Sequence, residues 1–600
     1  MSGICGILNL DGEPVDRVLL EKMTASLDFR GPDTREIWVQ GAIGFGHTLL
    51  RTTDESATER QPYSLDGEVY ITADGRIDGR EELLEKLSDR HTSQNHPDVK
   101  LILAAYRDWG ENCLEHLLGD FAFAIWDNRK QQLFCARDPV GAKLFYYARV
   151  GNSFIFSNTL NCLRLHPKCS DRLNDSAIAD FLLFGTNTAG ETTAFSDIHC
   201  LPGSCQLVIK NGTVRQQTYW TLTLPPQIRY RRSEDYIARF QEIIDRAVGD
   251  RLRTKNASIF LSGGLDSTNI AVAALERAKK RDFPLNLQAF TGVYDRLIPD
   301  RERHFAGLAA RSLGIPIHFL PADDYQLYQN WDKPELHLPE PIHAPLVLMH
   351  LEQMRDCSTH SRVLLHGQGG DEALRIATVR EMLQGMPLHH VAIDLARCLF
   401  QYRLKPPLGT GFLAAVSPAF PPEIPLPAWF APDFARSQNL QERWQSFWQK
   451  TLPLDRPPRS LAYHGLPPQP MWNFMFALND ASIFRAEVEV RFPFVDLRLL
   501  EYLLALPPLP WCAGKTLLRE TLRGKLPDSI RQRPKSPLVG DPVKLLLEAA
   551  DIKVFEGCIS DRLEEYVDRR QWQEEIATSA GREKRQILHP VTVGYWLQRL

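Results

Sequence analysis

Short apolar runs separated by Gly, Asn and Asp turns dominate the first 222 residues of the chain. The clearest runs lie at 4–10, 42–51, 68–78, 120–127, 132–138 and 153–158. Runs of this length between turn residues are typical of strands packed as antiparallel sheets. One helical pattern interrupts them at 99–110. We therefore predict a β-rich N-terminal domain over residues 1–222.

The pattern changes after a proline-bearing, basic stretch at 223–233, which we interpret as a linker. Helical patterns then follow at 236–252, 267–280 and 305–314, and buried strands at 257–261, 287–294 and 362–367. Strands that alternate with helices indicate a parallel sheet covered on both faces. The second domain is accordingly assigned residues 234–600, and the fold class is α/β.

Composition excludes several classes of protein. The 600 residues are 44% hydrophobic and 24% charged, and 70 basic against 74 acidic residues give a net charge of −4. This balance is typical of a globular protein and offers no overall attraction for nucleic acid. The sequence lacks an apolar run of about 18 residues and a secretory signal, so we expect no membrane partner. Scattered cysteines without a CxxC pair indicate reduced, mostly buried thiols in a cytoplasmic protein.

The strongest chemical signal follows the strand predicted at 257–261. There, Ser262-Gly263-Gly264-Leu265-Asp266-Ser267 leads directly into a helix. The glycines let the backbone approach a ligand, and the helix start offers unpaired N–H groups and a positive dipole end. We interpret the segment as a phosphate-binding loop that is distinct from a Walker A loop, because the lysine of that motif is missing. The alternative is a structural turn in which Asp266 caps the helix.

A second glycine-rich turn, Gly367-Gln368-Gly369-Gly370-Asp371-Glu372, follows the strand at 362–367. Carboxylates beside a phosphate-binding loop can hold Mg²⁺, which prefers oxygen ligands. The two acids could instead cap the next helix. Further along the chain, Lys535 and Lys515 are candidates to neutralise phosphate charge. For Lys535, the alternative is a solvated basic turn.

These motifs resemble those of the PP-loop ATP pyrophosphatases, and their order along the chain resembles the asparagine synthetase B-type family. The N-terminal part resembles the family's glutaminase domain through Arg30-Gly31-Pro32-Asp33 and the strings at 119–127 and 136–138. The C-terminal part adds matching strings at 491–496, 514–520 and 533–535. The resemblance implies an Ntn-type αββα sandwich, followed by an adenine nucleotide alpha hydrolase-like parallel-sheet domain with a helical subdomain.

The resemblance also implies an enzyme that uses ATP and Mg²⁺ to adenylate a carboxylate. Asp266 and Asp371 are the implied Mg²⁺ ligands. The implied catalytic residues are Lys535, Asp371, Gln368 and Glu372. The implied nucleotide-binding residues are Leu261, Ser262, Gly263, Gly264, Asp266, Ser267, Gly367, Gly369, Gly370 and Lys515.

The N-terminal domain departs from the glutamine-hydrolysing members at most of the positions compared. Ser2 stands where those members carry their nucleophilic cysteine, and Cys5 lies inside the first strand. The family string Asn-Gly-Glu reads Asp74-Gly75-Arg76, whereas Asp98 matches. The Asp74 carboxylate cannot donate to an oxyanion, and Arg76 would repel a substrate ammonium. We predict that this domain keeps its fold and lacks glutaminase activity.

Relatives with such a loss close an amide within one substrate. The strings at 51–56, 59–62 and 71–83 resemble those of lasso peptide cyclases. The resemblance implies an enzyme that joins an Asp or Glu side chain of a precursor core peptide to its N-terminal α-amine, with a leader-binding protein and a leader peptidase as partners. A β-lactam synthetase-like enzyme, an ammonia-dependent asparagine-forming enzyme and a non-catalytic scaffold are the alternatives.

The stretch between Asp371 and Arg491 is the predicted substrate enclosure. It holds a proline-rich run at 416–428, and the aromatics that follow are Trp429, Phe430, Trp444 and Trp448. The alternative is packing over the helical subdomain. Candidate bases for the attacking amine are His366, Glu372 and His343, each more often structural than catalytic.

Overall fold

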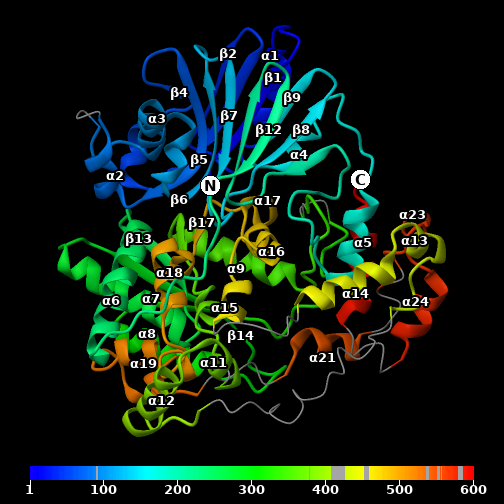
Figure 1. The fold of residues 1–600 in the computed structure, drawn as a ribbon. Coiled ribbons are helices and arrows are strands. Elements are labelled where there is room, and N and C mark those ends of the chain that lie inside the picture. Colours follow the sequence, from blue (N-terminus) through cyan, green and yellow to red (C-terminus); the bar gives the residue numbers. More distant parts are fainter. Residues whose placement is uncertain are drawn as a thin grey trace.

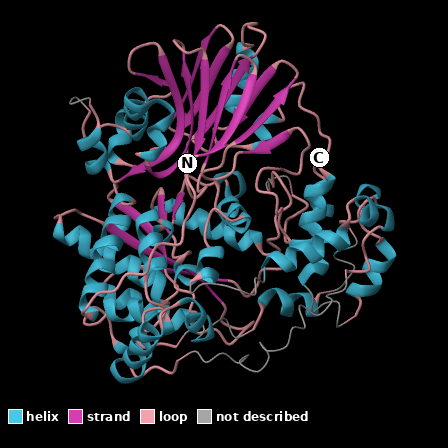
Figure 2. Cartoon of the chain, in the orientation of Figure 1, coloured by secondary structure: helices cyan, strands magenta, loops and turns pink. Residues whose placement is uncertain are grey.

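Two antiparallel sheets packed face to face form the N-terminal domain of the computed structural model (Figures 1 and 2). The structure describes residues 1–88, 92–333, 336, 338–377, 379–406, 426–451, 459–534, 540–550, 555, 557–578 and 585–600. The first sheet has the order β10 (Ile198–Cys200), β8 (Tyr146–Val150), β9 (Ser153–Ser157), β1 (Gly3–Asn9), β3 (Ile43–Leu49) and β2 (Thr34–Gln40). The second has the order β12 (Thr213–Thr218), β11 (Cys205–Lys210), β7 (Gln132–Arg137), β6 (Leu118–Asp127), β5 (Val69–Asp78) and β4 (Tyr63–Ser64).

Helices cover the outer faces of this sandwich. Helices α1 (Arg17–Ala25) and α4 (Leu160–Leu163) pack against the first sheet, and α3 (Asp98–Trp109) packs against the second. The layers therefore follow the predicted αββα order, and each predicted apolar run contains a strand. The edge strands β2 and β12 were missed because the side chains of β12 are mostly exposed and those of β2 are half-buried or exposed, so neither segment carries a long apolar run.

A parallel sheet forms the centre of the second domain. Its order is β15 (Ile317–Pro321), β14 (Asn286–Val293), β13 (Asn256–Phe260), β16 (Val363–Leu365) and β17 (Glu489–Arg491). The helices around it include α6 (Ser233–Asp250), α7 (Leu265–Lys280), α8 (Glu302–Leu313) and α9 (Val347–His360). The predicted strands and their parallel pairing are confirmed. Sequence reasoning missed β15, which is half-exposed, and β17, which has only three residues.

The rest of the second domain consists of short helices, and the C-terminal one lies beside the sandwich. They include α10 (Gly370–Ala373), α11 (Val379–Gly385), α12 (Leu388–Ala396), α13 (Pro432–Ser437), α14 (Leu440–Thr451), α15 (Ser460–His464), α16 (Pro470–Leu478), α17 (Ala481–Phe484), α18 (Leu497–Ala505), α19 (Thr516–Thr521), α20 (Asp528–Arg531), α21 (Pro542–Ala549), α23 (Asp561–Glu564), α24 (Arg569–Ile576) and α26 (His589–Leu597). The last of these packs against α5 (Asp175–Phe184) of the first domain. Over the described ranges, the helices are too short or too polar to cross a membrane.

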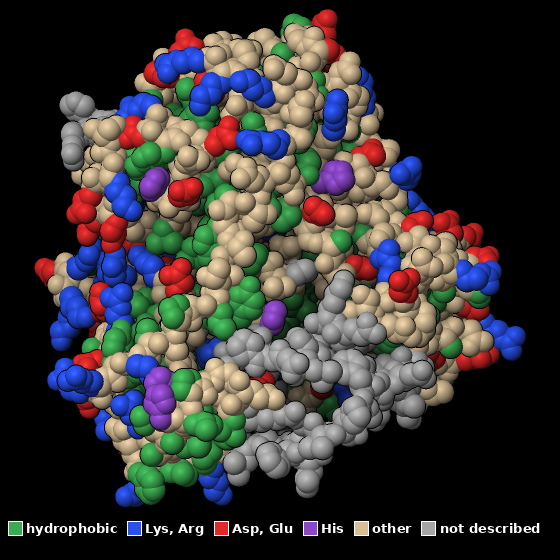
Figure 3. All heavy atoms as spheres, viewed as in Figure 1, with side chains coloured by type: hydrophobic (Ala, Val, Ile, Leu, Met, Phe, Trp, Pro, Cys, Tyr) green, Lys and Arg blue, Asp and Glu red, His purple; other side chains and the backbone are tan. Residues whose placement is uncertain are grey.

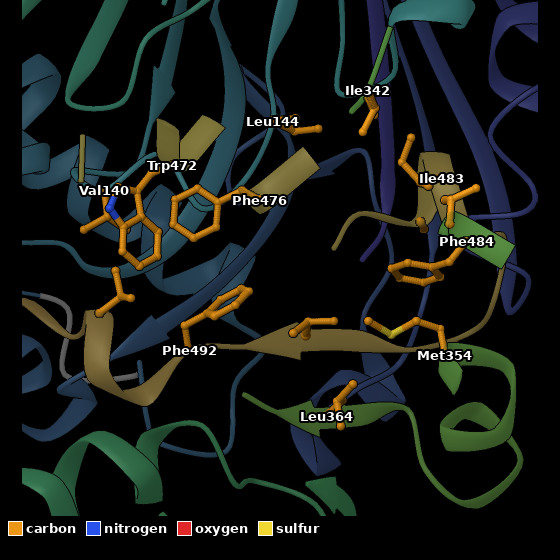
Figure 4. Close-up of a cluster of buried hydrophobic side chains, with 14 of the residues drawn as sticks. Val140, Leu144, Ile342, Met354, Leu364, Trp472, Phe476, Ile483, Phe484 and Phe492 are labelled. Atoms are coloured by element: carbon orange, nitrogen blue, oxygen red, sulfur yellow. The ribbon is translucent and has the colours of Figure 1, made fainter. Parts of the chain in front are cut away.

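One hydrophobic core runs through both domains. Val140 and Leu144 of the first domain belong to the same buried cluster as Leu364 of β16 and Phe492, which follows β17 (Figure 4). This shared core holds the two domains together by burying apolar surface between them.

On the surface, hydrophobic side chains gather at the lower left over α11 and α12 (Figure 3), where the exposed ones are Leu383, Leu388 and Ile393, followed by Leu399 and Phe400.

The aromatic residues assigned to a substrate enclosure pack inside the protein instead. Trp429, Phe430 and Trp444 are buried, and the Trp444 ring stacks on Phe184 of α5 with the ring centroids 5.7 Å apart. For these three residues the enclosure prediction is wrong and the packing alternative holds. Residues 407–425, which contain Pro418, Pro421, Pro422 and Pro425, and the side chain of Trp448 lie outside the described parts of the structure.

Buried ion pairs join the two domains. Arg30 Nη1 lies 2.6 Å from Asp480 Oδ1, and Lys143 Nζ lies 2.9 Å from Glu489 Oε2. The amino group of Met1 lies 3.4 Å from the same Glu489 oxygen, and Figure 1 shows the N-terminus at this junction. These side chains are almost wholly buried. Charges that have lost their water must be paired, so the contacts fix how the domains dock.

Glu489 is the acidic centre of this network. Burial alone would raise the pKa of its carboxyl, but Lys143 and Arg491 together hold that pKa well below its ordinary value. Burial lowers the pKa of the Met1 amino group to about 6. Glu489 therefore stays ionised across the neutral range and pairs mainly with the two side chains.

We expect Glu489→Gln to lower the free energy of unfolding by about 3 kcal/mol, because it leaves buried cations without their partner. Glu487→Gln is the matched control, since Glu487 is half-exposed and pairs with Arg362 at the surface; its cost should stay below about 1 kcal/mol. Denaturation followed by circular dichroism at pH 7 measures both. Equal losses would contradict the assigned role of Glu489.

The same pair of variants has a distinct pH signature. The pKa of Glu489 is lowered in the folded protein, so its stabilisation is complete above the unfolded value of about 4.3 and is lost as the pH falls through the folded value. The difference in stability between wild type and Glu489→Gln should therefore shrink as the pH falls below about 4. Between pH 5 and 7 the neighbouring Met1 amine also titrates, so the comparison is made below that range. A difference that grows as the pH falls below about 4 would have the wrong sign.

Candidate functional site

The first glycine-rich loop joins β13 to α7 in a conformation that needs glycine. Gly263 has φ +64°, and a Cβ on it would lie 2.6 Å from the carbonyl carbon of Phe305. The Ser262 hydroxyl accepts from the Gly264 N–H at 3.3 Å and lies 3.3 Å from Ser267 Oγ. The turn is thereby pinned, so the first N–H groups of α7 and Asp266 in its first turn hold fixed positions.

The second glycine-rich turn follows β16 and packs onto Asp266. Gly369 has φ +102°, and a Cβ on Gly370 would lie 2.7 Å from the Asp266 carboxyl carbon. The His366 N–H donates to the carbonyl of Arg491 at 2.9 Å, which ties the start of this turn to β17. Two turns that are far apart in the sequence thus meet at the carboxyl ends of adjacent parallel strands.

Lys515 joins the two predicted metal ligands. Its Nζ lies 2.8 Å from Asp371 Oδ1 and forms a short ion pair with Asp266 Oδ2. The other Asp266 oxygen is buried and has no hydrogen-bond partner among the described residues. Burial raises the pKa of Asp266, and Lys515 opposes that rise. The arrangement is a pair of carboxylates that holds a cation.

A cavity of about 430 Å³ opens on one side of these carboxylates. Ser262, Gly263, Gly264 and Lys515 line it together with Arg519. A second cavity, of about 520 Å³, is lined by Leu261, Ser267, Gly367, Gln368, Gly369 and Glu372, and also by Phe290 and Tyr294. Asp266, Asp371 and Ser262 line both cavities. A ligand with a polyanionic part and an apolar part could therefore extend across the carboxylates.

The candidate bases differ in their surroundings. Gln368 Nε2 donates to Glu372 Oε1 at 2.8 Å, and the buried Glu372 Oε2 has no partner in the described part of the chain. His366 lines the larger cavity, where burial lowers its pKa to about 4 and its Nδ1 accepts from the Gln368 N–H. His343 lies elsewhere, with its ring centroid 4.7 Å from that of His589. The structure thus brings together two of the three candidates.

Arg519 and Glu302 complete the site, and sequence reasoning gave neither a role. Arg519 donates to the carbonyls of Gly514 (2.7 Å), Arg531 (2.5 Å) and Arg533 (2.8 Å), and so ties the turn before Lys515 to the segment that leads towards Lys535. Glu302 lines both cavities and pairs with Arg533 at 3.0 Å. Arg519 lies in the string at 514–520 that carries part of the family resemblance, whereas Glu302 lies outside the motifs identified from the sequence. Lys535 itself lies outside the described residues.

Ser2 and Asp74, which align with a glutamine-hydrolysing site, lie within the buried ion network between the domains. The Ser2 N–H donates to Asp74 Oδ1 at 3.1 Å, and the Ser2 hydroxyl accepts from the Leu50 N–H at 3.2 Å. Lys143 Nζ lies 3.3 Å from Asp74 Oδ1. The Ser2 hydroxyl and the Asp74 carboxylate are therefore both held by contacts within the protein.

The charge of Arg76 is compensated. Asp78 and Asp120 each accept a hydrogen bond from its guanidinium at 2.8 Å. The arginine that was expected to repel a substrate ammonium therefore belongs to the buried ion network. Asp98 pairs with Arg80 and with Arg253, each at 2.5 Å. Asp98 matches the family pattern in sequence, but its carboxylate is already engaged by two arginines.

Comparisons with known proteins agree with this division of the chain. The family model described as "Glutamine amidotransferase domain" matches residues 1–220, and that described as "Asparagine synthase" matches residues 239–598. Asparagine synthetase [glutamine-hydrolyzing] 3 of Bacillus subtilis (strain 168) is 26% identical over 575 residues, which cover 90% of this chain and 86% of the relative.

Two further relatives match this chain over different lengths. Asparagine synthetase [glutamine-hydrolyzing] 2 of the same organism is 26% identical over 564 residues, 90% of this chain and 71% of the relative. Amidase chyE of Penicillium rubens is 27% identical over 377 residues, 59% of this chain and 55% of the relative. Similarity therefore extends over both domains in the two Bacillus proteins.

We expect Asp266→Asn and Asp371→Asn each to slow ATP cleavage by about 100-fold or more, because the amide keeps the volume and removes the charge that would hold a metal. Ser262→Ala removes one hydrogen-bonding hydroxyl and should cost about tenfold or less. Asp235→Asn, on the exposed start of α6, is the charge control. AMP release measures all four variants. Near-normal turnover in either of the first two would exclude that carboxylate as a metal ligand.

Proposed function

Because the chain belongs to the asparagine synthase family of ATP-dependent amide ligases, we propose that it is a lasso peptide macrolactam synthetase. It adenylates an Asp or Glu side chain of a precursor core peptide at the expense of ATP, with release of pyrophosphate. The peptide's own N-terminal α-amine then displaces AMP and closes the ring. A leader-binding protein and a leader peptidase are proposed to prepare the substrate.

The first half-reaction is supported by the residues around the carboxylates. Asp266 keeps a buried oxygen without a partner in the described chain, and the cation between it and Asp371 is a lysine ammonium, so the donor set suits Mg²⁺. Bound Mg²⁺ would neutralise phosphate charge during adenylation. Phosphate binding at the start of α7 and at Lys515 is supported by their lining one cavity, and we assign the adenosine and the acyl group to the larger cavity.

The proposal that the substrate is a peptide depends on the source of the attacking amine. In the N-terminal domain, Ser2 stands at the nucleophile position, and a hydroxyl is a far poorer nucleophile than a thiolate near pH 7. Asp74 is held by Lys143 and by the Ser2 N–H. Since the domain lacks the groups that release ammonia from glutamine, the attacking amine is proposed to belong to the acylated substrate itself.

An α-amine suits this site better than a lysine side chain. Gln368 cannot accept a proton near pH 7, and the lowered pKa of His366 makes it a weak base, so Glu372 is the candidate protein base that remains beside them. The nucleophile should therefore need little deprotonation. A lysine amine has a pKa of about 10.4 and an α-amine about 7.7–8.0, a difference of roughly 3 kcal/mol in preparing the neutral form at pH 7.

The alternative is an asparagine synthetase-type or β-lactam synthetase-like ligase that acts on a small acid. The names of the two Bacillus relatives favour the asparagine-forming version of this alternative. Both functions share the adenylation step and the residues around Asp266 and Asp371. They differ in the acid that is activated and in the amine that attacks.

The choice of substrate is tested with a leaderless precursor core peptide, whose sequence is to be sought in a short reading frame beside the gene. With ATP and Mg²⁺, we expect AMP release that depends on the peptide and a product lighter by one water. An N-terminally acetylated peptide should still support ATP–pyrophosphate exchange without cyclising, and a peptide with its ring Asp or Glu changed to the amide should support neither. AMP release with aspartate and ammonium, indifferent to the peptide, would establish the alternative.

We expect no glutaminase activity from the N-terminal domain. Ammonia released from glutamine should stay at the background of a protein-free control and should be equal in wild type and Ser2→Ala. Ser26→Ala is the matched serine control, since Ser26 lies outside the aligned positions. Ammonia release that Ser2→Ala abolishes and Ser26→Ala spares would overturn this part of the proposal.

A further inference from the structure

The ammonium of Lys515 lies where a cation between Asp266 and Asp371 would lie. It contacts Asp371 Oδ1 at 2.8 Å and forms a short ion pair with Asp266 Oδ2. A Cβ on Gly370 would clash with Asp266 at 2.7 Å, so the second turn is pressed against the first carboxylate. Two carboxylates held this close repel each other unless a positive charge lies between them.

The backbone that carries Lys515 is held in place. Gly514 and Lys515 have φ +53° and +55°, and together they form the tight turn before α19. Arg519 Nε donates to the Gly514 carbonyl at 2.7 Å, and Thr516 Oγ1 donates to the Ala513 carbonyl at 2.7 Å. Movement in this region therefore falls to the lysine side chain, a flexible four-carbon stem with a compact charge and three donors.

We propose that Lys515 is a resident counter-ion that keeps free divalent metal out of the site and moves onto the phosphates when the metal arrives with ATP. A divalent ion and an ammonium cannot both lie between the same carboxylates without strong repulsion. Free Mg²⁺ would have to expel a tethered cation from both of its carboxylate partners. Mg²⁺ bound to ATP brings the triphosphate, which offers that cation a new anionic partner inside the same cavity.

This exchange couples metal binding to nucleotide binding. Each ligand lowers the cost of admitting the other, and by linkage the enhancement is the same in both directions. The buried, unpartnered oxygen of Asp266 is available to the incoming ion. The inference rests on the proposed use of ATP and Mg²⁺, but it is independent of the identity of the acid or peptide. If Lys515 is instead a permanent structural ion pair, the coupling should be absent.

Binding of Mn²⁺ to the full-length protein, followed by the electron paramagnetic resonance signal of the free ion, tests the proposal without turnover. In wild type without nucleotide we expect weak binding, and tighter binding by about tenfold or more with the non-cleavable analogue α,β-methylene-ATP, after subtraction of the Mn²⁺ that the analogue binds in a protein-free control. Lys515→Met should bind Mn²⁺ without nucleotide at least about tenfold more tightly than wild type, because the competing charge is gone. Lys515→Arg should behave like wild type.

The matched control is Lys525→Met, because Lys525 pairs with Glu276 at 2.8 Å, away from the two carboxylates, and its loss should leave Mn²⁺ binding unchanged. Adding Asp266→Asn to Lys515→Met should remove the gain. Equal Mn²⁺ affinity of wild type and Lys515→Met without nucleotide would overturn the proposal.

The wild-type measurement covers the case in which Lys515→Met does not fold. Mn²⁺ affinity that is the same with and without the bound analogue would overturn the resident counter-ion on its own. Failure of the analogue to bind at all would instead count against the proposed ATP-dependent function. The two failures are therefore distinguishable.

Discussion

The buried pairing of Lys143 with Glu489 constrains most of the architecture, because neither charge tolerates separation from the other. Glu489 belongs to β17, and two residues later the carbonyl of Arg491 accepts from the His366 N–H. The second glycine-rich turn begins at that point. The position of the N-terminal sandwich is thus linked, through one strand and one hydrogen bond, to the turn that carries Asp371.

This constraint gives the N-terminal domain a structural role that does not depend on glutaminase activity. Arg30 is anchored to Asp480, and Arg251 is anchored both to Asp496 at 2.7 Å and to Asp78 at 3.3 Å. Removing the sandwich would strip several buried charges of their partners and expose one side of the shared core. The domain is therefore a structural partner of the ligase domain, whether or not it hydrolyses glutamine.

Local features of the sequence were enough to predict the strands with apolar runs and the turns that need glycine. The strand before Gly263 and the helix after it follow from short patterns, as do the turn at Gly369 and the αββα layers that the resemblance implies. The salt bridge of Lys515 with Asp266 joins residues 249 positions apart, and that of Arg30 with Asp480 joins residues 450 apart. No local pattern encodes such distances, so motifs identified Arg30, Asp266 and Lys515 but not which residues pair with them, and Asp480 was missed altogether.

The ion pairs between the two domains can form only late in the synthesis of the chain. The sandwich ends near residue 222, whereas Asp480, Glu489 and Asp496 leave the ribosome only some 270 residues later, which takes about 15 to 55 s at typical elongation rates. Throughout that interval, Arg30 and Lys143 have Asp74 of the sandwich beside them but lack Asp480 and Glu489. One carboxylate must then serve two cations, and the rest of the buried network forms only when most of the polypeptide is present.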